Sequence, residues 1–206
     1  MKIMVIGDSH SREGWKDLRL PEVVVQIHYL GPKLMFSFGR DKWILLDKKF
    51  NADVVVFCFG EIDVRNRIHE YDFCYEQVIT DMVNAYMEAV ELNVRPFPFL
   101  KTYIHFVPPA IKKDESYFTT EETTIVPGRF PFRGSNEDRR KYAFYINERL
   151  RAACLLHGFV FIDLYDRYCD SEGFFNERMS DGSVHIKDIS PLVAFLSDEL
   201  GLNEVK

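Results

Sequence analysis

The sequence predicts an α/β protein in which a mostly parallel, doubly wound sheet lies between helices. Two observations support this fold class. Five short runs rich in Val, Ile, Phe and Tyr are spread along the chain, and segments with helical periodicity alternate with them, as is typical of parallel sheets. The runs are almost continuously apolar, which indicates strands that are buried on both faces.

The strands and the long helices follow from local patterns. The predicted strands are Lys2–Ile6, Val23–Tyr29, Asp53–Phe59, Thr102–Val107 and Phe159–Asp163. A long amphipathic helix is predicted over Asp72–Leu92, where apolar residues recur at helical spacing. A second is predicted over Asn136–His157, because Ser135 and Asp138 suit a capping box and Gly158 ends the pattern.

The last helix is predicted to begin with Ser190 as its cap and Pro191 in its first turn, and to end at Gly201. A chain of 206 residues can bury one sizeable core, so we expect a single domain over residues 1–206.

Residues 110–134 depart from the pattern of short loops, because they are long for a connection and their periodicity is weak. They form either a lid over a site or a surface excursion without a role.

The composition excludes several classes of function. A formal charge of −6 without a basic stripe argues against a nucleic-acid partner. The apolar run after Lys2 is too short for a signal peptide, and Val54–Phe59, the longest strongly apolar run, is too short to span a membrane. The four cysteines include no C-x-x-C pair, so no zinc site is expected. Cys58 and Cys154 are expected to be buried free thiols, which fits a reducing, cytoplasmic location. The oligomeric state stays open.

The first strand leads into Gly7-Asp8-Ser9-His10, where Ser9 has two interpretations. A serine at the start of a helix commonly caps it by accepting a hydrogen bond from a backbone N–H group. Ser9 is a nucleophile instead if a base accompanies it. In doubly wound sheets, ligands collect at the carboxyl ends of the strands. Ser9, Gly60–Asp63 and Pro108-Pro109 all follow predicted strands, so we expect them to share one crevice.

Known motifs narrow the chemistry. The sequence contains no G-x-G-x-x-G, P-loop or H-E-x-x-H motif, and no G-x-S-x-G nucleophile elbow. A base and a carboxylate are available in SDGSVHIKD, where Asp181 and His185 precede the last helix. This stretch is alternatively only a turn, since Asp-Gly is a strong turn signal. The other histidines have no paired nucleophile, and His28 and His105 are expected to be structural.

Together these segments resemble the SGNH (GDSL-type) hydrolases over most of the chain. GDSH (Gly7–His10) looks like the family block with the nucleophilic serine, and GEID (Gly60–Asp63) stands where the family has G-x-N-D. IHFVPPA (Ile104–Ala110) is similar to the strand and loop that follow, and DGSVH (Asp181–His185) stands where an Asp-x-x-His block closes the fold. The resemblance implies a flavodoxin-like, three-layer α/β/α fold and ester hydrolysis without a metal or an organic cofactor.

The resemblance also implies roles for three residues: Ser9 as nucleophile, His185 as general base and Asp181 as orienting carboxylate. The roles agree with the chemistry, because a serine hydroxyl attacks well when an imidazole accepts its proton and a carboxylate fixes that ring. Two features depart from the family pattern. Three residues instead of two separate Asp181 from His185, so either a bulged turn or a backbone carbonyl would hold the ring. Ile62 replaces the oxyanion-binding asparagine.

The oxyanion donors are expected on loops at the same strand ends. The Ser9 N–H is one donor. The resemblance places another at a glycine after the second strand, where Gly31 is preferred to Gly39 because it follows the strand directly.

For the missing asparagine, the expected replacement is Arg65, whose guanidinium offers several donors. Asn66 is a neighbouring candidate. A salt bridge with Glu61 or Glu70 is the alternative role for Arg65. Asp63 belongs to the same loop.

The substrate follows only from a further resemblance. FGEIDVR (Phe59–Arg65) and the later segment Arg139–Leu150 look like a subgroup of SGNH-like proteins associated with glycan or polysaccharide assembly. This implies an O-acyl ester, such as O-acetyl, on a carbohydrate. A lipid or thioester hydrolase is the alternative among enzymes. Because Ile62 replaces the asparagine, a third alternative is that this chain is a non-hydrolytic domain that binds glycans or transfers acyl groups.

Overall fold

A computed structural model of the chain describes residues 1–114 and 130–202. Its centre is a parallel sheet of five strands in the order β2-β1-β3-β4-β5. The strands are β1 (Lys2–Gly7), β2 (Val24–Tyr29), β3 (Val54–Cys58), β4 (Lys101–His105) and β5 (Val160–Ile162). This is the flavodoxin-like strand order, so the predicted fold class is confirmed. Each strand lies within two residues of its predicted bounds.

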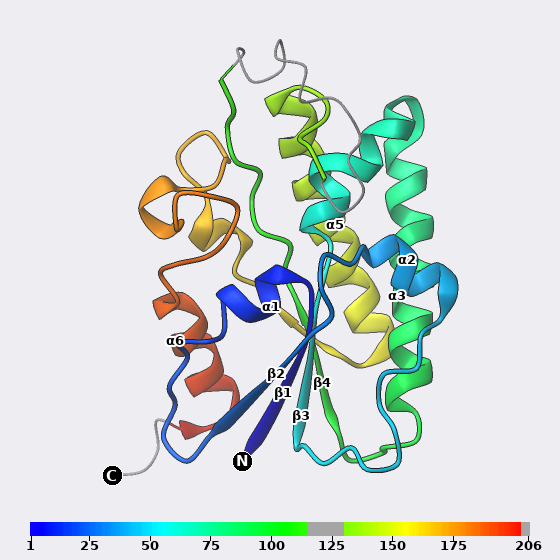
Figure 1. Ribbon diagram of the computed structural model, residues 1–206, viewed down its shortest axis with the longest axis vertical. Coiled ribbons are helices and arrows are strands. Elements are labelled where there is room, and N and C mark those ends of the chain that lie inside the picture. The colour runs from blue at the N-terminus through cyan, green and yellow to red at the C-terminus, as the bar shows by residue number, and fades with distance from the viewer. Residues whose placement is uncertain (115–129, 203–206) are drawn as a thin grey trace.

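Helices cover both faces of the sheet (Figure 1). One side carries α1 (Ser9–Glu13) and α6 (Ser190–Glu199), and the other carries α2 (Met35–Asp41), α3 (Tyr75–Val94) and α5 (Asn136–His157). Shorter helical segments are η1 (Asp63–Arg67), η2 (Ile68–Cys74), η4 (Tyr165–Tyr168) and η5 (Glu177–Met179). Among the described helices, none has the length and apolar character that crossing a membrane requires.

The helix ends test the local predictions. α5 has the predicted bounds, and its capping box is present: the Asp138 N–H donates to Ser135 Oγ, and the Ser135 N–H donates to Asp138 Oδ2. α3 begins at Tyr75, slightly later than predicted, because η2 precedes it. The predicted cap of α6 is wrong. Ser190 is the first helical residue, and its N–H donates to Asp188 Oδ1 at 2.9 Å.

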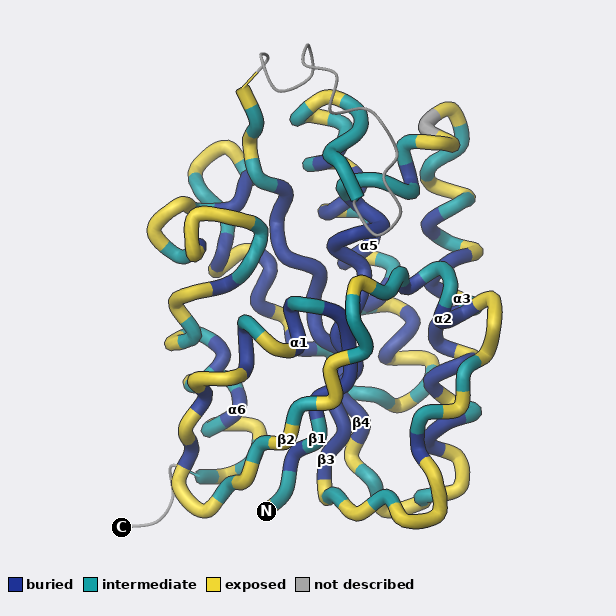
Figure 2. The backbone as a smooth tube through the Cα atoms, viewed as in Figure 1, coloured by how far each residue is buried: buried dark blue, intermediate teal, exposed yellow. Residues whose placement is uncertain are grey.

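Burial differs between the strands (Figure 2). Every residue of β3 is buried, as predicted from its apolar sequence. The same prediction is wrong for β2, in which no residue is fully buried. β2 is an edge strand and pairs only with β1, so one side of its backbone has no neighbouring strand in the sheet. Cys58 and Cys154 are buried free thiols, as predicted.

Two glycines bring the carboxyl ends of the strands together. A side chain at Gly7 would collide with the carbonyl oxygen of Cys58 in β3, which accepts the Asp8 N–H at 3.2 Å. Gly60 has a φ of +118°, and a Cβ there would lie 2.7 Å from Val107 Cγ2. Only glycine suits such close approach and such backbone angles, so both turns meet tightly at this edge of the sheet.

Candidate active site

The turn after β1 places Ser9 at the start of α1. Asp8 is the N-cap of α1, and its Oδ1 accepts the His10 backbone N–H at 2.9 Å. Ser9 is the first residue of α1 and is partly buried. No hydrogen bond within the described part of the chain involves its hydroxyl. Asp8 therefore caps the helix, and the Ser9 Oγ is available for chemistry.

Asp181 and His185 lie in one closed turn before α6. His185 Nδ1 is 3.2 Å from Asp181 Oδ2 and 3.1 Å from the hydroxyl of Ser183. The Asp181 N–H donates to the His185 carbonyl at 3.1 Å, and Gly182 takes a φ of +91°. The structure thus brings carboxylate and imidazole together despite the additional residue between them.

This turn packs on α1 through His10, the residue that follows Ser9. The Val184 carbonyl oxygen is 2.9 Å from His10 Nε2, and the ring centroids of His10 and His185 are 5.0 Å apart. His185 Nε2 is buried and has no hydrogen-bond partner among residues 1–114 and 130–202. No hydrogen bond joins Ser9 Oγ to His185 Nε2 among the described residues. Catalytic hydrogen bonds often tighten only when substrate binds.

The surroundings of His185 favour a neutral imidazole. Burial lowers its pKa from the usual 6.5, and the nearby His10 lowers it further, whereas Asp181 and Glu13 raise it. The pKa of Asp181 is also lowered: burial raises it, but hydrogen bonds from Ser183 and the charge and hydrogen bond of His185 together lower it more. An ionised carboxylate beside a neutral imidazole is the charge state that a general base requires.

The backbone N–H groups of Ser9 and Gly31 have no acceptor among the described residues. Gly31 follows β2 with a φ of +80°, and the preceding Leu30 N–H donates to the Gly7 carbonyl at 2.9 Å. Gly39 lies inside α2, where a Cβ would be 2.7 Å from the backbone nitrogen of Tyr86 in α3. Helix packing accounts for Gly39, so Gly31 is the better candidate donor.

The loop after β3 uses its polar residues to hold the fold. Ile62, at the position of the family's asparagine, is buried. Asp63 is also buried, and its carboxylate accepts the Met35 N–H at 2.7 Å and the Phe36 N–H at 3.2 Å. Burial raises the pKa of Asp63 to about 7, although these two donors lower it. Asp63 thus anchors the start of α2.

Asp63→Ala is expected to lower the free energy of unfolding by about 2–4 kcal/mol, because the buried Met35 N–H and the partly buried Phe36 N–H lose their acceptors. Asp63→Asn keeps one of the two acceptor oxygens in a neutral group of the same shape and should cost less than Asp63→Ala. Urea denaturation of both variants measures the difference. Equal losses in the two variants would show that the side-chain oxygen does not anchor α2.

Arg65 and Asn66 hold the segment that returns at residue 130. Arg65 Nε donates to Glu61 Oε2 at 2.9 Å and its Nη1 to the Phe130 carbonyl at 2.7 Å. Asn66 Nδ2 donates to the Pro131 carbonyl at 3.0 Å. Two Arg65 donors are thus engaged in a mostly buried salt bridge and a backbone contact, and the oxyanion role of Arg65 stays a prediction. The alternative, a salt bridge with Glu61, is the arrangement present.

Arg65→Ala is expected to destabilise the protein by about 3 kcal/mol, because a buried Glu61 carboxylate loses its partner. For a chain of this size the loss corresponds to about 6–12 °C in Tm. Turnover at a temperature where both proteins are folded should change less than about tenfold. Arg67→Ala, which removes a more exposed salt bridge with Glu70, is the matched control. An unchanged Tm with turnover lowered about 10²-fold would support the oxyanion role.

The predicted lid segment is only partly described. Residues 115–129 lie outside the described residues, so the choice between a lid and a surface excursion stays a prediction. The segment's first residues are anchored: the Ala110 carbonyl accepts the Phe175 N–H at 2.9 Å, and the Lys113 N–H donates to Asn136 Oδ1 at 2.8 Å.

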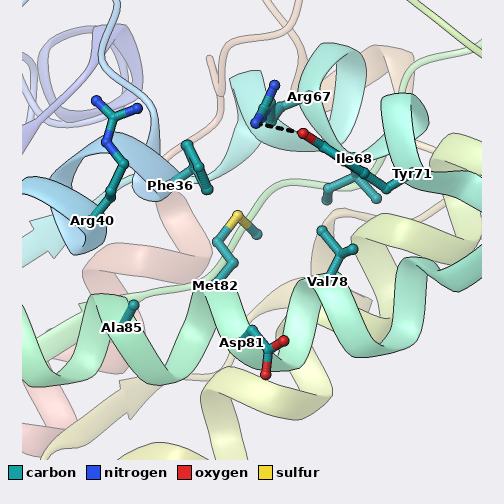
Figure 3. Close-up of a pocket in the computed structure, with 9 residues that line it drawn as sticks. All are labelled: Phe36, Arg40, Arg67, Ile68, Tyr71, Val78, Asp81, Met82 and Ala85. Carbon is teal, nitrogen blue, oxygen red and sulfur yellow. Dashed lines mark hydrogen bonds between the residues drawn. The ribbon is translucent and has the colours of Figure 1, made fainter.

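A separate pocket of about 400 Å³ lies between α2, the η1–η2 segment and α3 (Figure 3). Its apolar side chains are those of Phe36, Ile68, Val78, Met82 and Ala85. The guanidinium groups of Arg67 and Arg40 lie 4.5 and 5.4 Å from the centroid of the Phe36 ring. Neither Ser9 nor His185 lines this pocket, so it is distinct from the candidate reaction centre. In the described part of the chain, no group of three or more His, Cys, Asp or Glu residues could hold a metal ion.

One residue with a close connection to the site was missed. His10 has no predicted chemical role, yet its ring joins α1 to the turn that carries His185. The position directly after Ser9 was the available signal. Its partner, the Val184 carbonyl, is distant in sequence, so no local pattern points to the contact.

No protein-family model matches the chain, and no curated protein matches its sequence. Solved structures are similar in fold. A GDSL-like lipase from Bacteroides thetaiotaomicron has 12% identity and a TM-score of 0.58, with 100% of this chain and 89% of the other covered. A lipase/acylhydrolase from Enterococcus faecalis has 17% identity and a TM-score of 0.52, with coverage of 98% and 96%. A catalytic mutant of an acetylxylan esterase from Geobacillus stearothermophilus has 11% identity and a TM-score of 0.52, with coverage of 97% and 94%.

Proposed function

Because the chain has the fold of the SGNH (GDSL-type) hydrolases, we propose that it is a serine esterase. Ser9 is the nucleophile, His185 the general base and Asp181 the carboxylate that orients the base. One observation supports this proposal above the others. Ser9 Oγ and His185 Nε2 both lack partners among the described residues, on two segments that pack together, while Asp181 holds the other ring nitrogen. Nucleophilic catalysis by serine needs this arrangement.

In the proposed mechanism, Ser9 Oγ attacks the ester carbonyl carbon while its proton passes to His185 Nε2. The N–H groups of Ser9 and Gly31 stabilise the negative charge on the carbonyl oxygen. The C–O bond to the alcohol breaks, and the alcohol leaves with the proton from His185. Water then attacks the acyl group on Ser9 while His185 accepts its proton. Release of the acid returns that proton to Ser9.

We infer an O-acyl group on a carbohydrate, such as O-acetyl, as the substrate. Two observations support this class: the resemblance of Phe59–Arg65 and Arg139–Leu150 to glycan-associated proteins, and a structural neighbour described as an acetylxylan esterase. Other neighbours are described as a GDSL-like lipase and a lipase/acylhydrolase, which supports the lipid or thioester alternative. Ile62 removes the side-chain oxyanion donor and supports a third alternative, binding or transfer of acyl groups without hydrolysis.

A series of p-nitrophenyl esters of increasing chain length, together with acetylated xylo-oligosaccharides, tests the substrate class. The purified protein is expected to show its highest kcat/KM on the acetate ester and to release acetate from the oligosaccharide. The Ser9→Ala variant gives the background rate. A maximum on long-chain esters would favour a lipid hydrolase. Rates no higher than background on every ester would refute hydrolysis.

A further inference from the structure

A buried group of charged side chains lies next to Ser9, and the proposed mechanism does not use it. Asp8, His10 and Glu61 are 0%, 3% and 7% exposed. They come from the turn after β1 and the loop after β3, the two strand ends that meet at the site. Burying charged groups is costly unless they are paired. Arg65 pairs with Glu61, but the burial of Asp8 and His10 still needs an explanation.

His10 connects this group to the turn that carries His185. Its Nε2 lies 2.9 Å from the Val184 carbonyl oxygen, and since a carbonyl only accepts, this nitrogen carries a hydrogen. The other ring nitrogen, Nδ1, lies 3.3 Å from Asp8 Oδ1. The ring is also tilted by 49° against the neighbouring ring of His185. One side chain thus joins the nucleophile turn to the turn of the proposed base.

The charges around His10 favour its protonated form. Burial lowers its pKa, but Asp8, Glu61 and the Val184 carbonyl together raise it above the usual 6.5. The pKa values of the two neighbouring histidines, His185 and His105, are lowered instead. Burial is the main cause that lowers the pKa of His185, and His10 is the next. Burial likewise lowers the pKa of His105 in β4 to about 4, with a smaller contribution from His10.

We propose that His10 is a positioning residue for the base: as an imidazolium it holds the His185 turn on α1 through the Val184 carbonyl, and its charge favours the neutral form of His185. The inference rests on the proposed function, because it takes His185 as the base. Asp8 and Glu61 balance the buried charge of His10. Asp181 in its own turn and Glu13 from α1 are the carboxylates that act on His185 in the opposite direction.

Two substitutions separate the hydrogen bond from His10 to the Val184 carbonyl, here called the tether, from the charge of His10. Glutamine at position 10 keeps an N–H donor for the Val184 carbonyl but carries no charge. His10→Gln should therefore raise the pKa of His185 by on the order of one unit, because a like charge disappears while Asp8 and Glu61 remain. Its kcat at high pH should stay close to that of the wild type. His10→Ala also loses the tether, and its kcat at high pH should fall by up to about 10²-fold, as small displacements of catalytic groups do.

The test is an NMR titration of the His185 ring in the wild type, in His10→Gln and in His28→Gln, which changes an exposed histidine of β2. The titration does not depend on turnover. An upward shift in His10→Gln but not in His28→Gln supports the proposal, and an unchanged or lowered midpoint overturns it. An upward shift in a protein that hydrolyses no ester refutes the proposed function while the coupling between the two histidines stands.

The pH profile of kcat/KM completes the test. Its acid limb should move upward with the NMR midpoint in His10→Gln. Wild-type kcat at high pH in a folded His10→Ala would overturn the tether. If His10→Ala does not fold, the titration of His10→Gln still decides whether the charge of His10 acts on His185. A large loss of kcat at high pH in His10→Gln would contradict the role of the hydrogen bond to the Val184 carbonyl, because glutamine keeps that donor.

Discussion

Replacement of Ser9 by alanine is expected to lower turnover of an acetyl ester by at least about 10³-fold and to leave the protein folded. Turnover falls because Ser9 supplies the attacking oxygen. The fold persists because Asp8 caps α1, and no hydrogen bond among the described residues involves the Ser9 hydroxyl. Initial rates and the melting temperature of the variant measure the two effects.

Ser11 provides the matched control on the same helix. Its Oγ donates to the Asp8 carbonyl at 2.7 Å, so Ser11→Ala loses a buried hydrogen bond, which contributes about 1 kcal/mol. We expect this variant to be less stable than the wild type and to keep most of its turnover. A fully active Ser9→Ala, or a Ser11→Ala that is stable and inactive, would contradict the assignment of the nucleophile.

His185→Ala is expected to lower turnover by about the same factor as Ser9→Ala, since both groups act in the same proton transfer. Asp181→Ala should be milder, because Ser183 Oγ lies 3.1 Å from His185 Nδ1 and still holds the ring. The rates should be compared on an unactivated ester, whose alcohol needs the proton that His185 returns. Equal rates for the wild type and His185→Ala on such an ester would rule out this base.

The pH dependence of activity follows from the charge state of His185. The imidazole accepts a proton only when it is neutral, so activity is lost as the pH falls through its pKa. Burial and His10 lower that pKa from 6.5. The acid limb of kcat/KM is therefore expected below pH 6.5, and a limb clearly above this value would mean that another group titrates.

Local patterns in the sequence were sufficient for most of the fold. α5 was predicted with correct bounds because its start and end depend on neighbouring residues, the Ser135 capping box and Gly158. The exposure of β2 was not predicted, since it depends on which strand lies at the edge of the sheet. The short helix α2 was also missed. Its start is capped by Asp63, a residue of a different loop, and that contact leaves no local signal.

The candidate site shows the same difference between local features, which the sequence predicts, and contacts distant in sequence, which it does not. The pair Asp181 and His185 was expected from the resemblance of DGSVH to the family block, and the two residues do meet within one turn. The salt bridge of Arg65 with Glu61 was among the expected roles, because Glu61 lies four residues away, whereas its contact with the Phe130 carbonyl, 65 residues away, leaves no local signal. His10 was set aside for a similar reason, since Val184 lies 174 residues from it. Contacts between loops decide such roles, and only the folded chain brings those loops together.

Covalent labelling with a fluorophosphonate tests the central claim most directly, because the reagent reacts with activated serine nucleophiles. Peptide mapping by mass spectrometry of the labelled wild type should find one adduct, on Ser9, and the esterase activity should fall in proportion to it. Labelling should be absent in Ser9→Ala and slow in His185→Ala. An adduct on another serine, or undiminished ester hydrolysis after complete labelling of Ser9, would contradict the account.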